Sequence, residues 1–315
     1  MKPKIIAIVG PTGSGKTDTA IWLCKQLNGE IVSMDSMQIY RRMDIGTAKP
    51  TAEQMAQVPH HLIDVVEPDA MFTVSDYREK AFEAIEDILS RGKLPILVGG
   101  TGLYLNAVSY EMNLGANGAD EALRAQLNAI AEEKDGPHRL HEQLKAVDPA
   151  TAARLHENDT RRVIRALEIF ETTGKTMSEF SEDTKAEGPY RVLVYGLSLP
   201  RGTMYQRINQ RVDEMIGAGL ISEVEALLES GIKPKKEGGA MQAIGYKEIA
   251  AAIDGEYPME KAIDLIKQGS RRYAKRQWTW FRHDERTVWF DWTDFTAKDA
   301  LLQALLDKVN DDLHA

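Results

Sequence analysis

The sequence predicts an α/β fold in which a parallel sheet is flanked by helices and carries an all-helical insertion. Two observations indicate the sheet: Ile5–Val9 is an apolar run that ends in glycine, and residues 94–98 form a second such run. Runs of this kind are typical of strands buried on both faces. The third observation indicates the insertion, because residues 120–173 contain no strand candidate and have helical character.

The N-terminal elements alternate between strand and helix. After the first strand we expect a helix over residues 17–27 and a strand at residues 31–34. A strand, helix, strand unit of this kind is right-handed, so Asp35 should lie at the carboxyl end of a strand, beside the loop after the first strand. A helix over residues 74–90 and the strand at 94–98 continue the doubly wound pattern. Ligands bind at this edge of open parallel sheets.

The rest of the chain is expected to leave the sheet and return to it. The glycine-containing segment 115–119 breaks the alternation, and the polar segment 181–188 ends the helical stretch. Residues 192–197 predict a strand that rejoins the sheet, and helices should dominate from there to the C-terminus. We therefore predict a discontinuous core of residues 1–114 and 190–315 and a helical insertion domain of residues 115–189.

Composition narrows the class of protein. The 315 residues include 39 Lys and Arg against 48 Asp and Glu, a net charge of -9, which argues against a protein that coats nucleic acid indiscriminately. Any nucleic-acid site must therefore be a local basic patch. The single cysteine, Cys24, excludes an internal disulfide and a multi-cysteine zinc site. The first apolar run is far too short to span a membrane, so we expect a cytoplasmic protein without membrane association.

Residues 10–17, here called the phosphate loop, match the pattern G-x-x-x-x-G-K-(S or T) between a predicted strand and a predicted helix. The glycines let backbone N–H groups converge on phosphate oxygens, and the helix N-terminus adds positive potential. Lys16 supplies a full charge, and Thr17 can hold Mg²⁺. The fold is therefore P-loop NTPase-like. The residues expected to bind a diphosphate or a nucleotide are Gly10, Pro11, Thr12, Gly13, Ser14, Gly15, Lys16 and Thr17.

The motif does not identify the group attached to the phosphates. A nucleotide hydrolase would usually show an apolar strand that ends in a metal-supporting Asp, whereas the run 94–98 ends in Gly99-Gly100. The best substitute is Asp64, after Leu62 and Ile63. A P-loop kinase is therefore disfavoured but stays open as an alternative.

Six further segments resemble the bacterial tRNA dimethylallyltransferase family. They are residues 35–50, 59–64, 99–104, 159–168, 244–248 and 275–282, and the match is colinear over nearly the whole chain. The resemblance implies dimethylallyl diphosphate as prenyl donor, Mg²⁺ as cofactor, and transfer to N6 of the adenosine 3′-adjacent to the anticodon, within the tRNA anticodon stem-loop. No obligate protein partner is inferred. Transfer to free adenine nucleotides is a rival, although a helical insertion and basic helices favour a macromolecular acceptor.

The resemblance assigns three residues to the reaction. Asp35 is expected to act as the general base that accepts a proton from the adenine amine, in agreement with its predicted place at a strand end. Thr17 and Arg211 are expected on the leaving-group side, where an arginine can hold two phosphate oxygens at once. Two alternatives stay open. Asp35 could cap the next segment or hold metal, and Arg211 with Arg207 could lie on a solvent-exposed helix face.

The resemblance also predicts the tRNA contacts, and Gln38 among them could fill the space left by a flipped base. From the residues alone, a solvated, salt-bridged helix is favoured for the arginines at 161–165, turn chemistry explains Thr101 equally well, and core packing explains equally well the aromatic residues interleaved with the cations of 271–282. The predicted contacts are Asp35, Ser36, Met37, Gln38, Thr101, Arg124, Arg161, Arg162, Val163, Ile164, Arg165, Arg272 and Arg276.

Overall fold

The computed structural model describes residues 2–112, 121–182, 186–234 and 239–315. The chain forms two compact units, one made of Met1–Ser109 with Tyr190–Ala315 and the other of Tyr110–Pro189. The predicted start of the insertion at residue 115 and the segment 115–119 lie outside the described residues, as do residues 183–185 of the polar exit segment.

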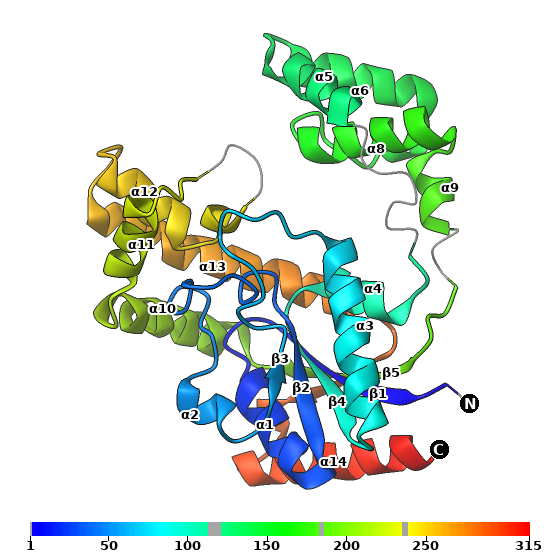
Figure 1. Ribbon diagram of the computed structural model, residues 1–315, viewed down its shortest axis with the longest axis vertical. Helices are drawn as coiled ribbons and strands as arrows, with labels where there is room; N and C mark the ends of the chain where they lie inside the picture. Colours follow the sequence, from blue (N-terminus) through cyan, green and yellow to red (C-terminus); the bar gives the residue numbers. More distant parts are fainter. Residues whose placement is uncertain (1, 113–120, 183–185, 235–238) are drawn as a thin grey trace. The chain divides into compact units, whose positions relative to one another are not determined.

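The first unit is built on a parallel sheet with the strand order β3-β2-β4-β1-β5-β6 (Figure 1). Its strands are β1 (Lys4–Val9), β2 (Gly29–Met34), β3 (His60–His61), β4 (Leu94–Gly99), β5 (Arg191–Ser198) and β6 (Thr287–Asp291). The four strands predicted from apolar runs are confirmed. β4 lies between β1 and β2, so the first two strands are not direct neighbours.

Helices cover both faces of this sheet. Ile5, Ala7 and Val9 of β1 pack in one apolar cluster with residues of α3 and α4, whereas Ile6 and Ile8 pack in another with residues of α1 and α14. The alternation follows from the period of two along a strand and explains why β1 is apolar throughout. The helices of this unit are α1 (Lys16–Leu27), α2 (Ala52–Met55), α3 (Val74–Ser90), α4 (Gly102–Ser109), α10 (Arg201–Gly217), α11 (Leu220–Glu229), α12 (Tyr246–Ile253), α13 (Met259–Arg282) and α14 (Lys298–His314).

The two edge strands were not predicted. β3 has only two residues, and β6 pairs with β5 alone, so part of it stays open to solvent and Val288 is 37% exposed. Neither strand has the continuous apolar run by which a buried strand is recognised. Helices dominate from residue 198 to the C-terminus as expected, and β6 is the strand in this region that the sequence did not predict.

The second unit is helical among its described residues, as predicted for 120–173. It consists of α5 (Glu121–Glu132), α6 (Gly136–Val147), α7 (Pro149–Ala152), α8 (Thr160–Thr173) and α9 (Met177–Glu182). Leu140, Leu144 and Val163 are fully buried in its apolar core. Its two ends meet, because Tyr110 pairs with Glu187 and the Glu111 N–H donates to the Ala186 carbonyl at 2.8 Å.

Candidate active site

The phosphate loop connects β1 to α1, as the motif requires. Gly10, Gly13 and Gly15 have φ values of 141°, 81° and 88°, a region that side chains other than glycine rarely adopt. A Cβ on Gly10 would also lie 2.5 Å from the Leu197 carbonyl oxygen of β5. The loop therefore needs glycine both for its backbone path and for its close approach to the neighbouring strand.

Lys16 lies across this loop. Its ammonium donates to the Pro11 carbonyl at 2.8 Å. Burial and, to a smaller extent, the nearby positive charge of Arg211 lower the pKa of Lys16 to about 8, although Asp35 partly opposes both effects. The ammonium is thus held without a full complement of negative charge, a state that a bound phosphate would relieve.

Asp35 directly follows β2 and its side chain folds back on its own loop. Oδ1 accepts the N–H groups of Met37 at 2.9 Å and of Gln38 at 3.4 Å. Burial raises the pKa of Asp35, while these two hydrogen bonds, Lys16 and Arg211 act in the opposite direction. Because burial has the larger effect, the carboxylate is more basic than an ordinary aspartate. Asp35 does cap its own loop through Oδ1, as one alternative expected, and Oδ2 is left for another partner.

Arg211, on α10, lies close enough to Asp35 and Lys16 to affect the pKa of each. It contributes to the walls of two cavities that both also include Thr12 and Asp35. Desolvation lowers the pKa of Arg211, and Asp35 is the first of the charges that oppose this shift. Arg207, one turn earlier, is exposed, as Arg211 also is in part, but Arg207 lines neither cavity. Arg211 is thus the arginine that faces the site.

The two cavities differ in chemistry. The larger, about 320 Å³, has apolar walls from α10 to α13, including Ile208, Val212 and Ile266. The smaller, about 100 Å³, contains Lys16 and Thr17 and reaches the polar ends of β2 and β4. Six residues contribute to both cavities, which makes them parts of one site: Thr12, Asp35, Thr47, Ala48, Arg211 and Tyr273.

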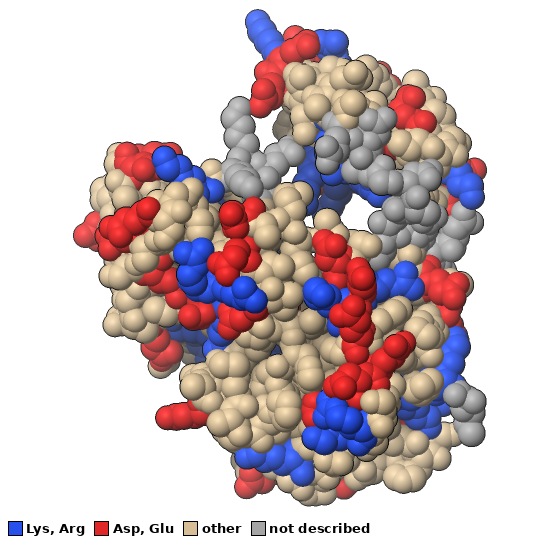
Figure 2. Space-filling model, viewed as in Figure 1, with Lys and Arg blue, Asp and Glu red and all other residues tan. Residues whose placement is uncertain are grey.

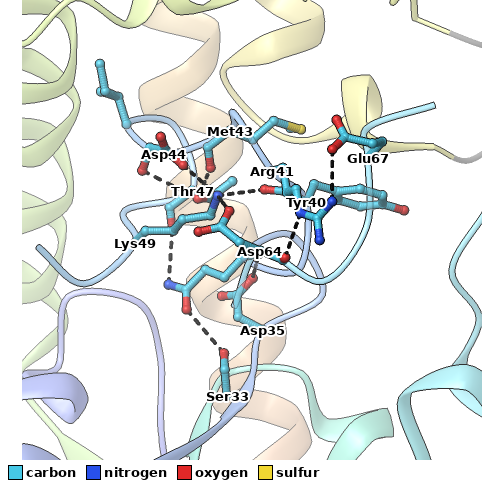
Figure 3. Close-up of polar contacts among 12 residues, drawn as sticks. Ser33, Asp35, Tyr40, Arg41, Met43, Asp44, Thr47, Lys49, Asp64 and Glu67 are labelled. Atoms are coloured by element: carbon cyan, nitrogen blue, oxygen red, sulfur yellow. Dashed lines mark hydrogen bonds and ion pairs between the residues drawn. The ribbon is translucent and has the colours of Figure 1, made fainter. Parts of the chain in front are cut away.

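The loop of residues 36–50 forms one wall of the site, and Lys49 connects parts of this loop through its polar contacts (Figure 3). The Lys49 side chain is 5% exposed, and its ammonium lies 2.6 Å from the Tyr40 carbonyl, from Asp44 and from Asp64. Asp64 is therefore engaged with a lysine, and β3 ends three residues before it. The metal-supporting Asp that would favour a kinase is not found at this position.

Gln38 also stabilises this wall. Its Nε2 donates to the carbonyls of Thr47 at 3.3 Å and Ala48 at 3.2 Å, and its Oε1 accepts from the Ser33 hydroxyl at 3.2 Å. In this arrangement the Gln38 side chain is hydrogen-bonded within its own loop and to β2. It is not free to occupy the space of a flipped nucleotide base. Ser36 and Met37 line the larger cavity. Thr101 accepts the Ser36 N–H at 3.3 Å across 65 positions, a contact that links the loop after β4 to the loop after β2.

The predicted RNA-binding arginines of the second unit fall into two groups. Arg124 and Arg165 both pair with Glu168, whose side chain is 3% exposed. Arg161 and Arg162 are exposed near the start of α8, and Arg162 is 3.2 Å from Asp159. The first pair therefore also has a structural role, whereas the second pair lies open to a ligand.

Two residues of the predicted RNA contact have buried side chains. Val163 is 0% exposed and Ile164 is 4% exposed, and both pack with Leu127 in the core of the second unit. Their side chains cannot meet RNA without unfolding α8. In a motif that alternates arginine with β-branched residues, the apolar positions follow the helix period and bury one face.

Arg272 and Arg276 are exposed on α13, in the first unit. The Arg276 guanidinium lies over the Tyr273 ring at 5.6 Å from its centre. Both arginines line a surface cleft together with Lys247. Elsewhere, on the face drawn in Figure 2, basic and acidic side chains are interspersed, which suits a chain of net charge -9.

A metal ion would need oxygen atoms beyond those of the protein. Among the described residues, no group of three or more His, Cys, Asp or Glu side chains is arranged to hold one. The Thr17 hydroxyl lines the smaller cavity beside Lys16. Mg²⁺ commonly binds one or two protein oxygens and completes its shell with phosphate oxygens and water, so these residues fit such an ion together with a diphosphate. In the described parts of the chain, no helix is both long and apolar enough to span a membrane.

The fold and this site define an enzyme of the P-loop class in which a basic carboxylate faces the phosphate loop. Residues 38–284 match the family model described as IPP transferase. The chain belongs to this family, and the predicted resemblance is confirmed. It is 51% identical to a tRNA dimethylallyltransferase of Halalkalibacterium halodurans, over 93% of both chains. It is 48% identical to the Bacillus subtilis protein of the same name, over 93% of this chain and 92% of the relative.

Solved structures agree with the family. A tRNA isopentenylpyrophosphate transferase from Bacillus halodurans superposes with a TM-score of 0.75 at 47% identity, over 99% of this chain and 97% of that one. A eukaryotic dimethylallyltransferase acting on tRNA gives a TM-score of 0.82 at 31% identity, over 98% of this chain and 80% of the other. The predicted P-loop NTPase-like fold is thereby confirmed.

Proposed function

We propose that this chain is a tRNA dimethylallyltransferase, which moves the dimethylallyl group of dimethylallyl diphosphate to N6 of the adenosine 3′-adjacent to a tRNA anticodon. The observation that carries the proposal is the position of Asp35 in a cavity wall shared with Arg211, beside the phosphate loop and next to an apolar space. A base, a phosphate site and an apolar site at one place are what this reaction needs.

The donor's diphosphate would bind the phosphate loop, Lys16 and Arg211. The two cations neutralise the charge that develops as the allylic carbon–oxygen bond breaks and its electron pair leaves with diphosphate. When bound, Mg²⁺ would be held by Thr17 and the phosphate oxygens and would add further neutralising charge. The apolar wall that includes Ile208 and Val212 would receive the five-carbon group.

Asp35 would accept the proton that the adenine amine loses as nitrogen bonds to the allylic carbon. Its raised pKa makes it a better base than an exposed aspartate. Its Oδ1 is engaged by Met37 and Gln38, so Oδ2 is the oxygen that would receive the proton. Thr17 and Arg211 lie on the donor side of this atom, which divides the roles between the predicted catalytic residues.

The acceptor would be the anticodon stem-loop, since an adenine must leave the stack before its amine can reach a recessed carboxylate. Arg161, Arg162, Arg272 and Arg276 would contact phosphates. A tRNA substrate supports a cytoplasmic location for the enzyme, and we propose that the reaction needs no protein partner. ATP could occupy the phosphate loop only as a competitor of the donor.

A paired labelling assay tests the proposal. Dimethylallyl diphosphate labelled in its carbons is incubated with Mg²⁺ and unmodified tRNA, with AMP, or with both, and a parallel reaction contains ATP labelled in its γ-phosphate. We expect prenyl label in tRNA alone, on an adenosine identified by mass spectrometry of the nucleosides, without any need for ATP. Prenyl label in AMP but not tRNA would favour the free-nucleotide rival, and phosphate transfer alone would identify a kinase.

A further inference from the structure

Three loops of the site begin at the carboxyl ends of neighbouring strands. A side chain from α13, distant in the sequence, connects two of these loops. β2, β4 and β1 are adjacent in the sheet, and their carboxyl ends lead to Asp35, to Gly100 and to the phosphate loop. Gln277 of α13 is 5% exposed and lies in the wall of the smaller cavity. It is the buried polar residue of a helix face that also buries Ala274 and Phe281.

Both ends of the Gln277 amide are used. Its Oε1 accepts the N–H of Thr12 in the phosphate loop at 2.8 Å, and its Nε2 donates to the Gly100 carbonyl at 3.1 Å. The partners fix the orientation of the amide, because one is a donor and the other an acceptor. The approach is close: a Cβ on Gly100 would lie 1.8 Å from the Gln277 Nε2.

The contacts continue to the loop that carries Asp35. The Tyr273 hydroxyl, one turn before Gln277 on α13, lies near the side chains of Gln277 and Thr101, and both side chains partly oppose the rise that burial causes in its pKa. Thr101 in turn accepts the Ser36 N–H at 3.3 Å, and Ser36 follows Asp35 directly. A series of polar contacts therefore runs from the phosphate loop through Gln277, Tyr273 and Thr101 to the residue after the base.

We propose that Gln277 is a positioning residue that fixes the phosphate loop relative to Asp35, and so fixes the distance between the reacting carbon and the amine. The inference rests on the proposed prenyl transfer. Both substrates are bound by other groups, so Gln277 should affect the rate of the chemical step more than the affinity for either substrate. A misplacement on the order of 1 Å between reacting groups costs about 10²-fold in rate.

Gln277→Glu separates positioning from simple structural support. A carboxylate at this position can accept from Thr12 but cannot donate to the Gly100 carbonyl, whereas a protonated carboxyl group can do both. We therefore expect the single-turnover rate, divided by that of the parent enzyme at the same pH, to be about 10 to 10² lower at pH 8. This ratio should recover several-fold as the pH falls and the new carboxyl group gains its proton. Division by the parent rate removes the titration of Asp35.

Gln57→Glu is the matched control, since Gln57 is exposed and its Oε1 accepts from Lys25 at 2.6 Å, a bond that a carboxylate keeps. Its ratio should stay near one at every pH. Tyr273→Phe removes one hydroxyl from the same series and should lower the rate about 3- to 10-fold, with the KM for tRNA unchanged within about twofold. It provides a second test if the charged variant does not fold.

Two results would overturn the inference: parental rates for both variants, or a deficit of Gln277→Glu that is the same at every pH and accompanies raised KM values. Titration with inorganic diphosphate and Mg²⁺ by calorimetry gives an independent readout. We expect Tyr273→Phe, and Gln277→Glu at the low pH at which its new carboxyl group is protonated, to bind diphosphate within about threefold of the parent. A parent enzyme that binds diphosphate but transfers no prenyl group to tRNA would instead refute the proposed function.

Discussion

Asp35→Asn should separate proton transfer from the shape of the loop at this site. The Asp35 Oδ1 holds the N–H groups of Met37 and Gln38, and asparagine has an acceptor oxygen that can take the same place. The loop after β2 should therefore keep its conformation. The atom that would receive the proton, Oδ2, becomes an amide nitrogen without basicity.

The expected magnitude follows from these contacts. Removing a general base costs about 10² to 10⁴ in rate, or roughly 2.7 to 5.4 kcal/mol at ~1.36 kcal/mol per tenfold change. Loss of the two loop hydrogen bonds, as in Asp35→Ala, adds about 0.5 to 2 kcal/mol of loop destabilisation by comparison with helix caps. The asparagine variant avoids this second contribution. We expect its affinity for tRNA and for the donor to stay within a few fold of the parent.

Rapid-quench measurement of a single turnover, with tRNA and dimethylallyl diphosphate both saturating, gives the required rate. Asp299→Asn is the matched control because Asp299 is exposed in the first turn of α14. A normal single-turnover rate for Asp35→Asn, with only a raised KM, would refute the assignment of Asp35 as the base.

Four further predictions concern charge. Because burial raises the pKa of Asp35, the single-turnover rate should rise with pH through a value above the ordinary aspartate range. Because the pKa of Lys16 is about 8, the affinity of the free enzyme for diphosphate should fall above that pH. Flat profiles of rate and affinity from pH 4 to 9 would contradict both expectations. Lys16→Ala and Thr17→Ala should raise the KM for the donor at least about tenfold, as removal of a charge-assisted contact does, without weakening tRNA binding in a filter assay. Arg161→Ala and Arg272→Ala, which remove exposed cations without an ion-pair partner among the described residues, should each flatten the slope of log affinity against log salt by about 0.7; unchanged slopes would make them solvated surface. Glu30→Ala should lower the free energy of unfolding by about 2 to 4 kcal/mol, less than a fully buried pair, because Glu30 is 1% exposed while Arg91 and Lys93, which bind it with His61, remain about one-third exposed. These contacts lower the pKa of Glu30, so its contribution should be complete above the unfolded-state value of about 4.3 and should decrease progressively in urea titrations as the pH falls from there toward the lower folded-state pKa.

The inner strands could be predicted from the sequence because burial on both faces leaves a contiguous apolar run, and β1, β2, β4 and β5 all have one. The phosphate loop could be predicted because backbone geometry there requires glycine. β3 and β6 could not, since an edge strand has one open side and mixed residues. The burial of Val163 and Ile164 could not be recognised from the motif alone, because the helix period divides its arginines from its apolar residues.

Side chains that join distant segments are the part of the site that sequence patterns hide. Lys49 looked like one cation in a polar loop, and its contacts with Asp44 and Asp64 depend on how that loop folds (Figure 3). Gln277 did leave a signal. It falls on the same helix stripe as Ile266, Ala274 and Phe281, and a polar residue on an apolar stripe must find partners for both ends of its amide.

The phosphate loop is made near the start of the chain but is held by residues made near its end. Gln277 bonds to Thr12 across 265 positions, and the Trp292 indole N–H donates to the Ser14 carbonyl at 2.8 Å across 278 positions. At about 5 to 20 residues per second on the ribosome, the loop waits roughly 15 to 55 s for these partners. A nascent chain, or one cut short before Trp292, can therefore assemble inner strands of its sheet and still lack a finished donor site. The donor site can therefore reach its final structure only after the segment that includes Gln277 and Trp292 has been synthesised.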